Sequence, residues 1–214
     1  IIDYLTTELV KMGHDVTVFA SADSNPKGRL IPCCDQGLRL EPTPTSAEAE
    51  HLSMLQMIKD REDEFDIIHF HTEMIHMPFF SHCPEKTITT SHSRMDMKGV
   101  EKFYSYFSDF PLVSISQSQR QPVPAVNWAA NIYHGIPAET YKLAPEGKQN
   151  YLAFLGRFSP EKGAHHAIDI AYESDMPIRM AAKICRQNPV NEIYYENVIA
   201  PQLYESFVEY VGEI

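Results

Sequence analysis

The sequence has no long hydrophobic run, no excess of positive charge and few cysteines, and each absence excludes a class of protein. No apolar stretch reaches the roughly 20 residues that a membrane-spanning helix needs, so we expect no transmembrane segment. The formal net charge of -11 at pH 7 argues against a general binder of nucleic acid or anionic membranes, because both need a basic face. Four cysteines in 214 residues are too few for a secreted disulfide scaffold. We therefore expect a reduced, cytoplasmic protein.

Several motifs that identify whole classes of enzyme are also missing. The chain contains no G-x-G-x-x-G fingerprint, no phosphate-binding P-loop, no G-x-S-x-G nucleophile turn, no Asp-x-Asp pair and no H-E-x-x-H zinc motif. The histidines His69, His71, His76, His82 and His92 suggest a metal cluster. However, histidines that end a buried strand are more often hydrogen-bonded pocket walls than metal ligands. We therefore expect no metal site and no cofactor.

The chain does contain a regular alternation of β-rich and helical segments. Short apolar runs predict strands at residues 16–20, 65–71, 86–90, 112–116, 130–133, 151–155, 178–182 and 207–211. Apolar residues at helical spacing predict helices at residues 1–12, 48–61, 98–107 and 190–204, and one that starts at Gly163. Residues 21–46, which are rich in proline and glycine, are expected to form a loop. This alternation is typical of α/β proteins with parallel sheets.

A change in composition marks a domain boundary. Residues 137–150 contain two prolines and a glycine and have no apolar periodicity, which favours a linker. We therefore predict an N-terminal domain at residues 1–137, a linker at 138–150 and a second domain at 151–214.

The most informative stretch joins the predicted strand 151–155, expected to be buried on both faces, to the helix that starts at Gly163. In such a unit the loop lies at the carboxyl edge of a parallel sheet, where α/β folds bind ligands, and the helix amino terminus favours an anion. Arg157 and Lys162 lie in this loop beside Gly156, and two such cations can bind one pyrophosphate. The alternative is a pair of solvated surface cations with Glu161 as a local partner, and spacing alone leaves both readings open.

One histidine also occupies a position where α/β folds bind ligands. His92 follows the predicted strand 86–90 and lies between two serines, where it can donate a hydrogen bond to a sugar hydroxyl or a phosphate. The alternative is an ordinary loop histidine exposed to water, which spacing alone favours.

Short blocks spread over the whole chain are similar to one protein family. They are residues 3–5, 9–20, 65–71, 90–92, 114–120, 133–136, 154–157 and 161–163. Through these blocks the chain resembles the retaining glycosyltransferases of family 4, which have the GT-B architecture of two Rossmann-like domains facing each other across a cleft.

The resemblance implies roles for particular residues. Family members use the Arg and Lys of the last blocks on the donor pyrophosphate, so Arg157 and Lys162 are expected to be catalytic, together with His92 at the position of the family's pocket histidine. The donor site is expected to include Gly156, Arg157, Lys162, His134 and Gly135. The acceptor side of the pocket is expected to include His71, Thr72 and Glu73.

The resemblance also implies a reaction and a departure from the family. We expect a sugar to pass, without a metal, from a nucleotide-sugar donor to a sugar, lipid or small-molecule acceptor with retention at the anomeric carbon. Family members carry a glycine-rich loop before the first block and an E-x7-E segment after the last, so both Rossmann-like domains are expected to be incomplete here. A nucleotide-sugar epimerase, a sugar phosphorylase and a non-catalytic sugar-nucleotide-binding module remain open alternatives.

Overall fold

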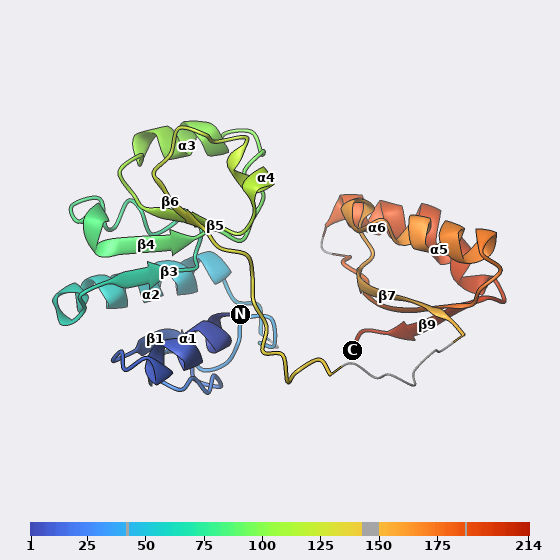
Figure 1. The fold of residues 1–214 in the computed structure, drawn as a ribbon, viewed down its shortest axis with the longest axis horizontal. Coiled ribbons are helices and arrows are strands. Elements are labelled where there is room, and N and C mark those ends of the chain that lie inside the picture. Colours follow the sequence, from blue (N-terminus) through green and yellow to red (C-terminus); the bar gives the residue numbers. More distant parts are fainter. Residues whose placement is uncertain (42, 143–149, 187) are drawn as a thin grey trace. The chain divides into compact units, whose positions relative to one another are not determined.

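The chain forms two units, each built around parallel β-strands. A computed structural model describes residues 1–41, 43–142, 150–186 and 188–214. It divides into unit 1, Ile1–Lys142, and unit 2, Leu143–Ile214 (Figure 1). All strand pairs among the described residues are parallel, which confirms the predicted α/β class. The predicted linker 138–150 includes residues 143–149, which lie outside the described residues, so its extent stays a prediction.

Unit 1 contains two parallel sheets. Strands β1 (Thr17–Ser21) and β2 (Arg29–Cys34) form one of them. The other has the order β3 (Ile68–Phe70), β4 (Thr87–Thr90), β5 (Leu112–Ser114) and β6 (Trp128–Asn131). The helices of the unit are α1 (Ile2–Lys11), α2 (Ala47–Lys59), α3 (Val100–Tyr106) and α4 (Gln117–Arg120), with 3-10 helices η1 (Glu62–Glu64) and η2 (Pro84–Lys86) before β3 and β4. Because β3 to β6 are parallel, their carboxyl ends lie at one edge of the sheet.

The core of unit 1 fixes the position of this sheet. Helix α2 begins at Ser46, whose hydroxyl accepts a hydrogen bond from the Ala49 amide and so satisfies one of the free donors at the helix start. Its residues Leu55 and Ile58 are buried in one cluster with Phe70 of β3. The strands therefore cannot shift without opening this core, and the residues at their ends are held in place.

Unit 2 is a three-stranded parallel sheet with helices packed on it. The strand order is β7 (Leu152–Arg157), β8 (Ile178–Lys183) and β9 (Val208–Gly212). Between the strands lie η3 (Pro160–Lys162), α5 (Ala164–Glu173), α6 (Pro189–Tyr194), the π-helix η4 (Tyr195–Ile199) and the 3-10 helix η5 (Ala200–Tyr204). Helix α5 buries Ala164, Ile168 and Ala171, which follow each other at helical spacing, in the same core as β8.

The prediction of a continuous loop at residues 21–46 is wrong, because β2 lies within it. Pro32 lies inside β2, where it pairs with Ala20, and a proline usually argues against a strand because it lacks the amide hydrogen. In the described sheets β2 pairs only with β1, so it is an edge strand, where proline is tolerated. The apolar, β-branched residues 16–20 also suggest a buried strand, but the neighbouring strand β1 is half-buried.

The prediction that the strand at 151–155 is buried on both faces is also wrong. Along β7, half-buried and exposed residues alternate, and Leu155 is 77% exposed. One face of the strand, which includes Phe154, packs against the core, while the other carries Ala153, Leu155 and Arg157. An apolar run therefore identified the strand but not the covering of its faces.

The predicted single helix at 190–204 is three different helical segments. It begins at Asn188, whose side chain accepts hydrogen bonds from the amides of Val190 and Asn191, and the α-helical pattern ends at Tyr194. The widened η4 and tight η5 that follow are explained by Pro201, which has no amide hydrogen and whose ring clashes with the preceding turn.

Candidate functional site

The carboxyl edge of the β3–β6 sheet gathers polar residues from three strands. His71 follows β3 directly, Ser91 and His92 follow β4, and His134 lies shortly after β6. Strand ends at this edge are where open α/β sheets bind their ligands. We call the set of His71, Glu73, Ser91, His92 and His134 the edge cluster.

The imidazole rings of the edge cluster form a row. The Nδ1 of His71 lies 2.8 Å from the Nε2 of His92. The other ring nitrogen of His92, Nδ1, lies 3.3 Å from the Nε2 of His134. The row continues to His69, whose ring stacks on that of His71 with 4.4 Å between the ring centroids. A neutral imidazole carries one ring proton, so His92 donates to one of its two neighbours and accepts from the other. His71, His92 and His134 are therefore joined by a directional chain of hydrogen bonds, and His69 adds to the row by stacking.

The surroundings favour the neutral forms of His71 and His92. Burial lowers the pKa of His71 to about 3, and His69 and His92 nearby add to the effect. Burial is also the main cause that lowers the pKa of His92, although the Glu73 carboxylate acts against it. Neutral imidazoles donate and accept hydrogen bonds, as hydroxyl groups do, and so can bind the hydroxyl groups of a sugar.

Glu73 holds the end of β4 in place. Its carboxylate accepts hydrogen bonds from the Ser91 hydroxyl at 2.7 Å and from the His92 amide at 2.8 Å. The backbone of Glu73 is left-handed, with φ of 54°, a conformation that side chains with a Cβ rarely adopt. Strain of this kind persists where the surroundings determine the conformation, which is frequent at functional sites. Thr72, also predicted for this pocket, lies 3.4 Å from the Nδ1 of His76 through its hydroxyl.

Two residues that support the edge cluster were not predicted as site residues. The Gln119 amide donates to the main-chain oxygens of Ser91 and Ser93, at 3.1 and 2.8 Å, and so fixes the loop that carries His92. The Nε of Arg120 donates to Ser114 at the end of β5, and its guanidinium stacks over Trp128. The sequence signal was present in the polar block 116–120 directly after a strand, but nothing in its spacing indicated these contacts.

A cavity of about 960 Å³ borders the edge cluster. Its lining includes β1, α1 and α2 together with His69, His71 and Thr72. The cavity follows β1 and β3, which belong to different sheets, so it is the space between the two sheets of unit 1. The predicted pocket residues His71 and Thr72 line part of it, whereas Glu73, His92 and His134 do not.

In unit 2 the predicted cation loop lies between β7 and α5. Arg157 is the last residue of β7, and Lys162 ends η3, one residue before the helix. Both are exposed, and an Nη of Arg157 lies 3.5 Å from a carboxylate oxygen of Glu161. Glu161, which the sequence suggested as a local partner of these cations, therefore does lie close to Arg157. A pair this exposed contributes about 0–1 kcal/mol, so an anion can displace Glu161.

The turn after Lys162 depends on a glycine. Gly163 has φ of 65° and is the residue at which α5 begins. Next in the chain, the His165 amide donates to the Tyr194 hydroxyl, which also lies 2.7 Å from the His165 Nδ1. Gly156 lies in β7 beside Phe154, where an added Cβ would meet the Phe154 ring at 3.4 Å.

The structure thus groups the predicted site residues by unit. His71, Glu73, His92 and His134 come together in unit 1, whereas Gly156, Arg157 and Lys162 share one loop of unit 2. Gly135 follows His134 and is exposed. Within the described residues, one group of side chains could hold a metal ion, Glu62 with His82 and Cys83, and it includes none of the predicted site residues. No helix in the described part of the chain has the length and apolarity needed to cross a bilayer.

Comparison with known families decides what this architecture belongs to. The model of Glycosyltransferase Family 4 matches residues 1–130. The chain belongs to this family. No curated protein matches it.

Solved structures, two of them named as glycosyltransferases, share the fold of this Family 4 chain. HepE from Anabaena, in complex with UDP and glucose, is 17% identical with a TM-score of 0.65, over 99% of this chain and 65% of that chain. A glycosyltransferase from Rickettsia africae is 15% identical with a TM-score of 0.63, over 100% and 63%. AviGT4, involved in avilamycin A biosynthesis, is 18% identical with a TM-score of 0.58, over 98% and 54%. These matches confirm the GT-B class of Rossmann-like fold, and the chain spans 54% to 65% of their length.

Proposed function

We propose that this Family 4 chain belongs to an enzyme that transfers a sugar from a nucleotide diphosphate sugar to an acceptor hydroxyl, with retention at the anomeric carbon. The observation that carries the proposal is the loop of unit 2, where Arg157 and Lys162 are both exposed next to the start of α5. Helix amino termini and cations favour phosphate groups. The complex of HepE with UDP and glucose supports a nucleotide sugar as the donor.

The hard step of such a reaction is the departure of a charged diphosphate. Arg157 offers a planar fork of donors and Lys162 a compact charge, and both stabilise negative charge as it develops. Because these cations belong to the protein, we propose that the step needs no metal ion. The weak contact of Arg157 with Glu161 is given up when the diphosphate binds.

The edge cluster of unit 1 is proposed to bind hydroxyl or phosphate oxygens of the reacting sugars. His92 touches the donor sugar or its phosphate, and His71 lies toward the acceptor. Glu73 is a positioning residue, because it holds the His92 amide and the Ser91 hydroxyl without needing to contact substrate. His134 and Gly135 are proposed to complete the donor side.

Binding of UDP to the full 214-residue chain tests the cation loop. Titration followed by phosphorus NMR should show that Arg157→Ala and Lys162→Ala each weaken binding about 10- to 100-fold, because a hydrogen bond to a charged group contributes about 1.5–3 kcal/mol. Arg179→Ala is the matched control, since Arg179 lies near the amino end of β8 and pairs with Glu209. Equal binding by all three variants, or none by the parent chain at millimolar UDP, would contradict the assignment.

Product analysis tests the reaction itself. Incubation of an active enzyme containing this chain with labelled UDP-glucose and a panel of acceptors should give a glycoside of unchanged anomeric configuration. A new nucleotide sugar as the only product would identify an epimerase, and a sugar phosphate a phosphorylase. We further propose a cytoplasmic location, which the four free thiols support because reducing compartments keep cysteines unpaired.

A further inference from the structure

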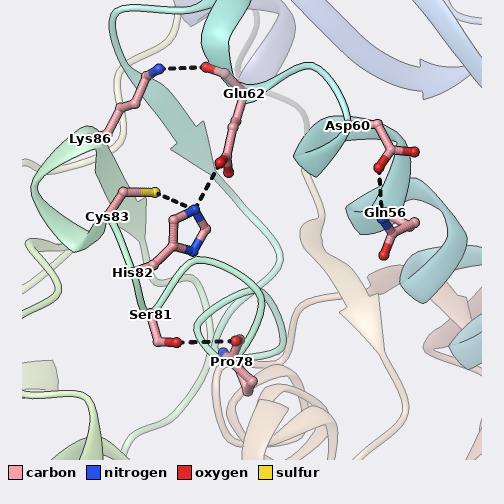
Figure 2. Close-up of polar contacts among 8 residues, drawn as sticks. All are labelled: Gln56, Asp60, Glu62, Pro78, Ser81, His82, Cys83 and Lys86. Atoms are coloured by element: carbon pink, nitrogen blue, oxygen red, sulfur yellow. Dashed lines mark hydrogen bonds and ion pairs between the residues drawn. The ribbon is translucent and has the colours of Figure 1, made fainter.

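Glu62, His82 and Cys83 bring three different metal-binding atoms together in unit 1. The Nε2 of His82 lies 2.8 Å from a carboxylate oxygen of Glu62 and 3.5 Å from the sulfur of Cys83, as the dashed lines in Figure 2 show. Both contacts converge on the same ring nitrogen. The one proton that this nitrogen can carry points well at only one of the two partners. The set is therefore rich in lone pairs and poor in hydrogen-bond donors.

A second observation points to a missing partner at this place. The other carboxylate oxygen of Glu62, Oε2, is out of contact with solvent and has no hydrogen-bond partner among the described residues. Buried polar atoms are almost always paired, and an unpaired one calls for an explanation such as an ion. A cation bound by the Glu62 carboxylate would satisfy it.

The backbone around the three ligands is already fixed. The ammonium group of Lys86 donates to the main-chain oxygen of Glu62 at 2.5 Å, which ties η2 to η1. The amide of Lys86 donates to the Cys83 oxygen at 3.1 Å, and the amide of Cys83 to the Phe80 oxygen at 3.0 Å. Binding a metal therefore requires movement of side chains only, which keeps the cost of ordering low.

The ligand types and distances select the kind of metal. Calcium and magnesium prefer oxygen ligands throughout, whereas zinc binds sulfur, nitrogen and oxygen in tetrahedral sites. Zinc bond lengths of about 2.0 Å to nitrogen and 2.3 Å to sulfur place these two atoms about 3.5 Å apart, and the separation of Nε2 and Sγ is 3.5 Å. The distance between Nε2 and Oε1, 2.8 Å, has to widen by about 0.5 Å, which the half-exposed His82 ring permits.

We propose that Glu62, His82 and Cys83 bind one zinc ion, or a divalent transition metal of similar preference, with water as the fourth ligand. The thiol of Cys83 loses its proton to solvent as the sulfur–metal bond forms, so the thiolate and the Glu62 carboxylate together balance the two charges of the ion.

The position of this site separates it from the proposed sugar transfer. Glu62 precedes β3, and His82 and Cys83 precede β4, so the metal joins the segments that enter the two strands at their amino ends. The edge cluster lies at the carboxyl ends of the same strands. The metal is therefore expected to stabilise unit 1 and to take no part in catalysis.

Zinc and cobalt binding by the reduced, metal-free full chain tests the proposal. One zinc ion should bind per chain, and the cobalt form should show a thiolate-to-metal absorption band that disappears in Cys83→Ser. The variants His82→Ala and Glu62→Gln should each weaken zinc binding by about tenfold or more. Cys185→Ser and His14→Ala, which alter the same residue types elsewhere, should bind zinc as the parent chain does.

A second measurement needs no variant and so does not depend on the folding of one. Zinc should slow alkylation of Cys83 in the parent chain, measured by peptide mass spectrometry, and leave alkylation of Cys185 unchanged. Zinc should also raise the unfolding temperature of unit 1. Failure to bind zinc, a Cys83→Ser variant that binds it as tightly as the parent, or equal protection of both cysteines would overturn the proposal.

Discussion

Replacing Glu73 tests whether the edge cluster depends on one carboxylate and one strained backbone. In Glu73→Ala, the Ser91 hydroxyl and the His92 amide lose their acceptor, while the left-handed backbone at φ of 54° is still occupied by a residue with a Cβ. In Glu73→Gly, the same two hydrogen bonds are lost, but the strain is relieved because glycine adopts this conformation without a clash. The difference between the two variants isolates the strain.

The magnitudes follow from these two terms. A hydrogen bond to a charged group contributes about 1.5–3 kcal/mol, and the lower end applies to the half-buried Glu73, so Glu73→Ala should lower the free energy of unfolding of unit 1 by about 3 kcal/mol. A residue with a Cβ in the left-handed region costs about 1–2 kcal/mol, so Glu73→Gly should be more stable than Glu73→Ala by about 1 kcal/mol. Glycine is normally the less stable of the two, which makes the order diagnostic.

Trp128 offers a specific readout. It is the one tryptophan of the chain, lies in β6 and packs against the core of unit 1, so its fluorescence reports the unfolding of that unit. With a dependence on urea of about 2 kcal/mol per molar, the midpoint should fall by about 1.5 M in Glu73→Ala and by about 1 M in Glu73→Gly. If Glu73→Gly were no more stable than Glu73→Ala, or if Glu73→Ala cost less than about 1 kcal/mol, the assigned role of Glu73 would be wrong.

The remaining predictions concern the surroundings of both sites. Burial lowers the pKa values of His71 and His76 to about 3, so below pH 6.5 the unfolded chain takes up two protons that the folded chain refuses. Unit 1 should therefore lose about 2.8 kcal/mol of stability per pH unit, about 1.4 for each histidine, down to about pH 3. Urea midpoints from Trp128 fluorescence at pH 7 and 5.5 check this, and equal midpoints would contradict it. Gln119→Glu removes the amide that donates to Ser91 and Ser93, and should destabilise unit 1 by about 2 kcal/mol in the same assay. An unchanged urea midpoint would show that the loop after β4 does not depend on Gln119. Gly163→Ala should lower the stability of unit 2 by about 1–2 kcal/mol, because Gly163 has a positive φ, and should speed hydrogen exchange in α5. The control Gly156→Ala, whose added Cβ would only contact the Phe154 ring, should change hydrogen exchange little. Equal effects of the two variants would contradict the role assigned to Gly163.

The sequence predicted much of the fold because the relevant signals are local. Apolar runs and helical spacing located, to within a few residues, eight of the nine strands found in the described residues. The strand β2 was missed because Pro32 and the preceding glycine are typical of loops. Spacing could not predict that Leu155 is exposed, since an apolar side chain is compatible with either face of a strand. The faces are covered or open according to which helices pack on them.

The candidate sites divide in the same way. Strand ends followed by histidine, and glycine followed by spaced cations, marked His92 and the loop of Arg157 and Lys162 from the sequence alone. Local patterns in the sequence did not predict the contacts of Glu73 with Ser91 and His92, which lie 18 and 19 residues further along the chain. They also did not predict the contact of Glu62 with His82, 20 residues apart, and the sequence predicted no metal site.

The class of fold, the order of its elements and the family resemblance can be read from the sequence, because they depend on local patterns and on matching blocks. Which side chains meet depends on the three-dimensional packing of the chain. Parallel strands bring their ends to one edge of a sheet whatever the length of chain between them, so Glu73 reaches the end of β4 and Glu62 reaches the segment before it. Distances between elements are set by core packing and by crossover connections, and no spacing along the chain encodes them.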